Sequence, residues 1–466
     1  MILSHNNRMK KFLPAILSLA MLAGGVALYA QDAGAQAPAA EAPAAAAPDA
    51  AAAAAPAPPK IDTGDTAWVL VSTALVLLMT APGVALFYGG MVRTKNALGT
   101  ILQSFVVLCL ISIQWVLWGY SLAFGPDIGG IIGSLAWAGL SNVGTMPNAD
   151  YAATIPHQAF MLFQMMFAVI TPALITGAFA ERMKFTAFLL FTLLWSTFIY
   201  DPLAHWVWGV GGWIRTLGAL DFAGGTVVHI SSGIAGLACA LVLKKRLGHG
   251  KESFHPHNLP MTITGVCLLW FGWFGFNAGS ALGAGELATS TFTATNTATA
   301  AAALTWMVAE WIYRGKPSAL GTVSGAVAGL VAITPASGFV GPISSIWIGM
   351  GAGGLCYLFV MLKPLFGYDD ALDAFGVHGI GGIWGALATG LFASKAINSA
   401  GADGLFFGNP SLLGIQALAV LISVVFAFLG TLIILAIVGA ITGLRVNEED
   451  ERLGLDLSQH DEKAYS

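Results

Sequence analysis

Long apolar stretches alternate with short polar segments along the chain from Trp68 onward. A helix needs about 20 apolar residues to cross the hydrocarbon core of a bilayer, and each stretch is about that long. The pattern therefore predicts an all-α membrane protein with eleven transmembrane helices. The predicted spans are residues 64–90, 98–124, 157–180, 185–207, 222–243, 260–283, 290–313, 318–336, 339–362, 374–393 and 410–443.

Two stretches depart from the ordinary span length. The last predicted span, 410–443, is longer than the bilayer requires, so we expect this helix to be tilted or to project beyond the lipid. The run GGIIGSLAWAGL at 129–140 is too short and is interrupted by glycine. We place it in an external loop.

Basic residues fall almost entirely on one side of this predicted topology. Lys and Arg accumulate in cytoplasmic loops, so the fourteen-to-three bias predicts an external mature N-terminus and a cytoplasmic C-terminus, in a bacterial inner membrane. The fourteen are Arg93, Lys95, Arg182, Lys184, Lys244, Lys245, Arg246, Lys251, Arg314, Lys316, Lys363, Arg445, Arg452 and Lys463, and the three are Lys60, Arg215 and Lys395.

Composition supports the same class of protein. Hydrophobic residues make up 56% of the chain and charged residues 9%, and the mean hydropathy is +0.76. These values lie outside the usual balance of soluble globular proteins. We therefore expect the lipid bilayer as the surroundings of the chain and no nucleic acid as a partner.

The first 60 residues have the composition of targeting and tether sequence. Residues 1–35 combine basic residues, an apolar run and small residues, which predicts a cleaved signal peptide. Residues 36–60 are rich in Ala and Pro and are predicted to be a disordered linker. The membrane domain is then expected at 61–444 and a polar cytoplasmic tail at 445–466.

Two histidines occupy matching places in the predicted spans. His229 lies in the fifth span and His378 in the tenth, and an aspartate precedes each by eight residues, namely Asp221 and Asp370. This predicts two five-helix repeats followed by a long eleventh helix. Because each repeat has an odd number of spans, the two copies must be inverted in the membrane, with a site at their interface.

The histidine pair allows more than one interpretation. A single intramembrane histidine can be a structural residue bonded to a neighbouring carbonyl, whereas two at equivalent positions favour neutral rings that line a pore. A metalloenzyme site is a third possibility, but no further metal ligand stands near either histidine in its span. We expect no metal, no cofactor and no enzymatic activity.

Several motifs resemble those of the ammonium transporters of the Amt/Mep/Rh family. They are DFAGGTVVHISSGIAGLACALVLKKR at 221–246, FQMMF at 163–167, GAFAERMKF at 177–185, WFGFNAGS at 273–280 and FGVHGIGG at 375–382. The resemblance covers nearly the whole chain from residue 64 and implies a homotrimer with one pore in each subunit. It also implies transport of ammonium or ammonia, and hence a role in nitrogen uptake.

The resemblance assigns roles to individual residues. An external aromatic site recruits ammonium, a pair of stacked phenylalanines forms the gate below it, and twin histidines line an apolar bore through which ammonia passes after deprotonation. The implied recruitment site consists of Trp208, Phe167 and Ser280, the gate of Phe167 and Phe276, and the pore lining of His229, His378, Phe163 and Trp273.

The two aspartates and the tail have competing interpretations. Asp221 is expected to cap its helix and can also help the passing ion to lose a proton, and Asp370 is expected to be a structural cap. The tail resembles that of the Amt branch, which implies regulation by a cytoplasmic PII-type signalling protein. The residues that carry this likeness are Gly454-Leu455-Asp456, His460, Glu462 and Tyr465.

Two related functions stay open beside the transporter. One is an ammonium sensor with little flux, although sensors usually add an output domain and this chain stops shortly after the tail. The other is a Rh-like gas channel, which the Amt-type tail and Trp208 make less favoured.

Overall fold

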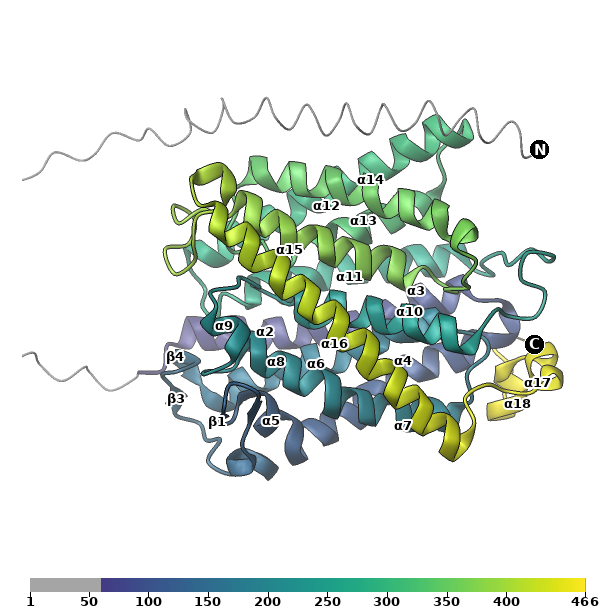
Figure 1. Ribbon diagram of the computed structural model, residues 1–466, viewed down its shortest axis with the longest axis horizontal. Helices are drawn as coiled ribbons and strands as arrows, with labels where there is room; N and C mark the ends of the chain where they lie inside the picture. Colours follow the sequence, from purple (N-terminus) through teal and green to yellow (C-terminus); the bar gives the residue numbers. More distant parts are fainter. Residues whose placement is uncertain (1–59, 466) are drawn as a thin grey trace, which may run out of the picture. The chain divides into compact units, whose positions relative to one another are not determined.

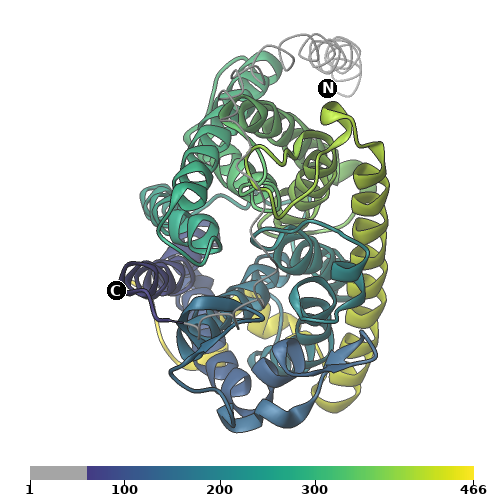
Figure 2. The same cartoon turned by 90° about the vertical axis from the view of Figure 1, so that its left-hand side faces the viewer.

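A computed structural model describes residues 60–465 of the chain. The predicted signal peptide and all but the last residue of the predicted linker lie outside these residues. From Ile61 onward the chain forms one compact unit. Its long helices lie side by side, and α16 (Pro410–Thr442) crosses them obliquely (Figures 1 and 2). Whether this helix is tilted in the bilayer or projects beyond the lipid, as its length predicts, stays a prediction.

The helices follow one another with short connections, and strands occur only in one loop region of the described residues. The first part of the chain contains α2 (Thr63–Leu78), η2 (Met79–Val84), α3 (Ala85–Met91), η3 (Thr94–Asn96), α4 (Ala97–Gln114), η4 (Trp115–Gly119), α5 (Tyr120–Phe124), β1 (Asp127–Ile128), β2 (Ile132–Gly133), η5 (Leu135–Leu140), β3 (Pro147–Asn148), β4 (Ala152–Pro156), α6 (His157–Phe179), α7 (Phe185–Trp195), η6 (Ser196–Tyr200), α8 (Asp201–Trp208), α9 (Trp213–Thr216), η7 (Gly225–Ile230) and α10 (Ser231–Leu243).

The second part of the chain is helical throughout its ordered elements. It contains α11 (Leu259–Gly279), α12 (Glu286–Arg314), α13 (Ala319–Ile333), α14 (Pro342–Phe366), η8 (Phe375–Gly379), α15 (Ile380–Phe392), η9 (Leu405–Phe407), α16, α17 (Glu448–Leu453) and α18 (Leu455–His460). Five of the η elements are π-helical turns: η2, η4 and η6 lie inside longer helices, whereas η7 and η8 form the start of the helices that continue as α10 and α15.

Among residues 60–465, nine helices are long and apolar enough to cross a membrane. The two remaining predicted spans correspond to α12 and α13. Helix α12 has 29 residues but is rich in threonine and alanine, and α13 has only 15 residues. The chain is therefore a multi-pass helical membrane protein, while the count of eleven crossings stays a prediction.

The run at 129–140 is not a spanning helix. Strands β1 and β2 form a short antiparallel hairpin there, with Asp127 opposite Gly133, and the 3-10 helix η5 follows. A second short hairpin pairs β3 with β4. The segment therefore forms a loop, as its length and glycines predicted.

Small residues allow the helices of the second part to approach very closely. A Cβ atom added at Gly349 would lie 2.2 Å from the carbonyl oxygen of Ala298, and one at Gly353 would lie 2.4 Å from that of Ala302. Helices α12 and α14 are thus in contact through their backbones. Such packing is typical of membrane helices, because small residues let their backbones meet.

A buried ion network lies at the end of the bundle that carries the tail. Asp369 accepts hydrogen bonds from the side chain of Arg246 at 2.9 Å, and Arg246 also contacts Glu181 at 3.1 Å. Burial alone would raise the pKa of both carboxyls. The charges and hydrogen bonds of Arg246, joined at Glu181 by Arg93, more than offset burial and hold both pKa values below their ordinary range.

We expect Asp369→Asn to destabilise the protein by about 3–5 kcal/mol, because it leaves the buried Arg246 without its main counter-charge. Since the folded pKa values of Asp369 and Glu181 are depressed, the stability that these carboxyls contribute is complete above their unfolded pKa values near 4 and is lost as the pH falls through the folded values. Thermal unfolding in detergent from pH 7 to pH 3 measures both effects.

The variant should therefore show a flatter loss of stability in acid than the parent. The control is Glu286→Gln. Glu286 is exposed and has no partner among the described residues, so this substitution removes one charge without breaking an ion pair. Equal melting temperatures for the parent and Asp369→Asn at pH 7 would contradict a stabilising role of the network.

The tail packs against the same end of the bundle. Glu451 accepts hydrogen bonds from the side chain of Arg445 and from the backbone N–H of Leu247. Asp456 accepts hydrogen bonds from the backbone N–H groups of Leu98 and Gly99, at the start of α4. The tail is thus bound to two segments of the membrane domain that are distant in sequence, the start of α4 and the loop after α10.

Candidate functional site

The two histidines are in contact inside the helix bundle. His229 lies in η7 and His378 in η8, and their Nδ1 atoms are 3.4 Å apart. The rings are nearly parallel, with centroids 5.4 Å apart, and both side chains are buried. In a hydrogen bond between two Nδ1 atoms one must donate and the other accept, so the pair shares one proton at this contact.

Glycines bring the two histidine helices together in opposite directions. A Cβ atom at Gly233 would lie 2.1 Å from the backbone nitrogen of Gly379, the residue after His378. Reciprocally, a Cβ atom at Gly382 would lie 3.0 Å from the backbone nitrogen of Ile230, the residue after His229. Each glycine follows its histidine by four residues. The two segments therefore make equivalent contacts with each other, as expected for approximate two-fold symmetry.

Aromatic rings continue from the histidine pair toward the end of the bundle opposite the tail. Phe276 of α11 lies 6.1 Å from His229, centroid to centroid, and Phe167 of α6 lies 4.3 Å from Phe276. Phe163 and Trp208 contact Phe167 at 5.0 and 5.8 Å. Aromatic side chains from α6, α8 and α11 thus form, together with His229, a continuous series of ring contacts.

Trp273 is placed beside this series by its own hydrogen bond. Its ring stacks on His229 with centroids 5.4 Å apart, and its indole N–H donates to the hydroxyl of Thr334 at 2.9 Å. The hydroxyl of Thr334 donates in turn to the carbonyl of Leu330. The indole N–H of Trp273 is therefore hydrogen-bonded on the side away from the histidines. Toward His229, Trp273 presents the apolar face of its ring.

Trp208 is held at the outer end of the series by the chain around it. Its indole N–H donates to the backbone carbonyl of Asp221 at 2.9 Å, and its own carbonyl accepts from Arg215 at 2.6 Å. Ser280 ends α11 and donates its hydroxyl to the carbonyl of Phe276 at 2.9 Å. Phe167 and Trp208 are thus in contact, whereas Ser280 is linked to them only through Phe276.

The two aspartates have equivalent surroundings. The carboxylate of Asp221 accepts the backbone N–H groups of residues 224–227 and the hydroxyl of Thr226. The carboxylate of Asp370 accepts the backbone N–H groups of Ala374 and Phe375. Each carboxylate therefore satisfies free N–H groups at the start of a histidine helix, where they have no partner within the helix.

Asp221→Ala is expected to lower the free energy of unfolding by about 3 kcal/mol, because it leaves several buried N–H groups without acceptors. Thermal unfolding in detergent measures the change. Asp221→Asn keeps one acceptor oxygen and should lose less. A melting temperature of Asp221→Ala equal to that of the parent would show that water replaces the carboxylate without cost.

A small cavity reaches His378 from the side that carries the tail. Its volume is about 20 Å³, which is room for roughly one water molecule. Asp373 on its rim contacts Lys363 at 2.5 Å, and Tyr88 donates its hydroxyl to the carbonyl of Leu174. The cavity is lined by Phe87, Tyr88, Met91, Trp306, Ser324, Leu372, Asp373, Val377 and His378.

These rim residues were not singled out from the sequence. Asp373 lies five residues before His378, so its proximity to the histidine in the sequence was a usable signal. Tyr88 lies in an apolar span far from any motif and gave no such signal. Only the packing of α3 (Ala85–Met91) against the second part of the chain places it here.

One fully buried ring nitrogen of the histidine pair is left without a hydrogen bond among the described residues. The Nε2 atom of His229 is buried and makes no hydrogen bond to any residue in the range 60–465. Buried polar atoms are usually bonded, so this nitrogen is available to a small guest. Within the same range, no group of three or more His, Cys, Asp and Glu side chains is placed to hold a metal ion.

Comparison with known proteins gives a consistent result. A model described as the Ammonium Transporter Family matches residues 67–465. The ammonium transporter of Bacillus subtilis (strain 168) is 59% identical over 403 residues, covering 86% of this chain and 98% of that protein. The crystal structure of Candida albicans Mep2 is similar with a TM-score of 0.80 at 38% identity, covering 87% and 91% of the two chains. A structure named Sensor Amt Protein has a TM-score of 0.78 at 31% identity, covering 85% and 98%.

Proposed function

The chain belongs to the ammonium transporter family, and we propose that it recruits ammonium at an aromatic site, removes a proton and passes ammonia between the two histidines. The observation that carries this proposal is the buried contact of His229 with His378 beside the free Nε2 atom of His229. Ammonia has both a lone pair and N–H groups, so it can accept from or donate to such a ring.

Recruitment is assigned to Trp208, Phe167 and Ser280. The faces of aromatic rings attract a cation through the ring quadrupole, and the contact of Phe167 with Trp208 brings two such rings to one point. The hydroxyl of Ser280 donates to a backbone carbonyl, which leaves its oxygen lone pairs to accept an N–H group of ammonium.

Phe167 and Phe276 form the gate below this site. Their rings are 4.3 Å apart and both are buried, so a guest passes only when at least one ring rotates. Phe163 and Trp273 line the path on either side of the pair. Beyond the gate, a permeant leaves water and is surrounded by apolar rings.

The histidines favour ammonia over ions in this dry segment. Their mutual contact is the only hydrogen bond of either ring among residues 60–465, so neither imidazole is paired with a carboxylate there. A bare ion would lose its hydration without a compensating charge, which costs many kcal/mol. Ammonium escapes this cost because it can shed a proton, whereas potassium resembles it in size and charge and cannot.

Purified protein in a supported membrane tests this function. Ammonium pulses should produce a transient current and potassium pulses none, if the proton crosses separately along the histidines and transport is electrogenic. Ammonia flux without a current would support the proposed pore but contradict proton transfer along the histidines. No ammonium-dependent flux of either kind would overturn the proposed function.

The assembly and orientation also belong to this proposal. We infer a homotrimer with a pore in each subunit, an external N-terminus and a cytoplasmic tail in a bacterial inner membrane. Arg93, Arg246 and the tail residue Arg445 lie at one end of the bundle, which supports one basic face. Crosslinking in the membrane measures the number of subunits, and labelling of a cysteine introduced into the tail measures on which side of the membrane the tail lies.

The tail is proposed to couple the pore to a cytoplasmic PII-type signalling protein. Its hydrogen bonds to α4 and to the α10–α11 loop support this, because movement of the tail would disturb both. Binding of a PII homologue to membranes that contain this protein tests the coupling. Binding that persists unchanged after removal of residues 445–466 would remove the tail from the proposal.

A sensor with little flux is the second candidate. The similarity to the structure named Sensor Amt Protein favours keeping it, since its TM-score is 0.78. A Rh-like gas channel differs in lacking recruitment of the ion. The flux per bound ammonium ion distinguishes the sensor from the transporter. The dependence of the flux on ammonium concentration, at a fixed ammonia concentration, distinguishes the gas channel from the transporter.

A further inference from the structure

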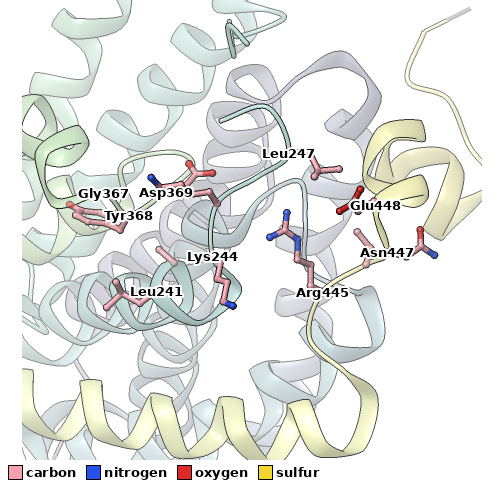
Figure 3. Close-up of a pocket in the computed structure, with 12 residues that line it drawn as sticks. Leu241, Lys244, Leu247, Gly367, Tyr368, Asp369, Arg445, Asn447 and Glu448 are labelled. Carbon is pink, nitrogen blue, oxygen red and sulfur yellow. The ribbon is translucent and has the colours of Figure 1, made fainter. Parts of the chain in front are cut away.

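A second, larger cavity lies apart from the histidine pair, at the end of the bundle that carries the tail. It has a volume of about 700 Å³ and lies where α10 ends, between the segment that follows α14 and the segment that follows α16 (Figure 3). Its lining includes Leu241, Lys244, Lys245, Gly367, Asp369, Arg445 and Glu448. None of these residues contacts the proposed ammonia path.

Two positive charges in this lining are not neutralised. Lys244 and Lys245 are exposed, and within residues 60–465 neither ammonium group makes an ion pair or a hydrogen bond. The other charges of the lining do have partners. Arg445 is bound by Glu451, Asp369 is bound by Arg246, and Glu448 lies 3.8 Å from Arg452. The free charge that the cavity offers to a ligand is therefore positive.

Apolar side chains are exposed beside these lysines. Leu241, one turn before Lys245, is 48% exposed, and Val242 follows it. Leu365 and Phe366, directly before the lining residue Gly367, are 72% and 65% exposed. Exposed apolar groups next to unpaired basic groups suit the boundary between the acyl chains and the headgroups of a bilayer.

The backbone at Lys244 is held in a conformation that lysine rarely adopts. Its φ is +62° and its ψ is −170°, immediately after the end of α10. Such a conformation costs about 1–3 kcal/mol and persists only where the surrounding structure imposes it. In Figure 3 the ammonium group of Lys244 points away from the guanidinium of Arg445.

We propose that this cavity binds the phosphate of an anionic phospholipid from the leaflet on the tail side. Lys244 and Lys245 contact the phosphate, and the acyl chains lie along Leu241 and the exposed end of α14. A free phosphate would use the two charges but not the apolar surface, so the lipid is the better match for the whole site. This site is independent of the transport mechanism proposed above.

Native mass spectrometry of the purified full chain tests the site, with phosphatidylglycerol as the anionic probe and phosphatidylcholine as the zwitterionic one. The variant Lys244→Gln/Lys245→Gln should bind phosphatidylglycerol roughly 10- to 30-fold more weakly, since each basic residue near a membrane surface contributes on the order of a few-fold in affinity. The matched control Lys251→Gln/Lys316→Gln removes the same charge from exposed lysines outside the cavity and should bind like the parent.

Three results would overturn the proposal. The first is an equal loss of binding in both double variants, which would indicate only a general effect of charge. The second is unchanged binding in Lys244→Gln/Lys245→Gln. The third is full competition by soluble glycerol phosphate, which would mean that the site takes a free phosphate group and not a lipid. If the glutamine variant fails to fold, Lys244→Arg/Lys245→Arg should fold and keep the affinity of the parent.

Discussion

His229→Asp is expected to open the pore to potassium. The substitution places a carboxylate at the buried contact with His378, where the parent has two rings that share one proton. A fixed negative charge offsets several kcal/mol of the cost of desolvating a cation, so we expect potassium flux to rise roughly 100-fold or more from the background level. Potassium and ammonium currents of the reconstituted variant, measured on one membrane, give this ratio directly.

The control for this prediction is His229→Gln, which is polar but uncharged. It should still exclude potassium, and its ammonia flux should fall because the contact with His378 is lost. If His229→Asp excluded potassium completely and conducted ammonium like the parent, selectivity would not depend on the absence of charge between the rings. The aromatic rings above the histidines would then be the better candidate for the selective step.

Gly233→Ala is expected to destabilise the protein severely and to separate the two histidines. The new Cβ atom would lie 2.1 Å from the nitrogen and 2.4 Å from the Cα atom of Gly379. Both are backbone atoms of the opposing helix, so no side chain can move aside. Overpacking of a core usually costs about 1–3 kcal/mol, and we expect the upper end or more here. Thermal unfolding in detergent and ammonium flux measure the two effects.

Other glycines provide a graded comparison. At Gly382 the nearest atoms are 3.0 Å away, so Gly382→Ala should cause a smaller loss than Gly233→Ala. At Gly414, inside α16, an added Cβ atom meets nothing within 4 Å. Gly414→Ala should therefore be neutral or stabilise the helix by up to about 1 kcal/mol, because alanine favours the helix over glycine. Equal stability of Gly233→Ala and Gly414→Ala would contradict the close crossing.

Local patterns in the sequence predicted the helical elements well, and failed where long-range packing decides the outcome. Most predicted spans lie within a few residues of the observed helices, because a run of apolar residues and its polar ends is a local property. The π-helical turns were not predicted. Neither were the end of α11 and the start of α12, which the sequence placed at 283 and 290 but which lie at Gly279 and Glu286. The turn between them, Ser280–Gly285, is apolar enough to resemble part of a span.

The candidate site was predicted as a set of residues and not as an arrangement. The resemblance named His229, His378, Phe167, Phe276 and Trp208, and each lies in the series of ring contacts. Their order and distances were not available from spacing along the chain. The cavity beside His378, with Asp373 and Tyr88, was missed, since it forms only where separate helices meet.

The sequence by itself determined the class of the protein, because the cost of placing polar groups in lipid imposes long apolar spans that can be seen residue by residue. It also determined the equal spacing of an aspartate and a histidine in two helices. Only the tertiary structure decided that His229 and His378 meet across 149 residues, in helices that cross at Gly233 and Gly382. Such a crossing depends on shape complementarity between distant backbones, which no local pattern records.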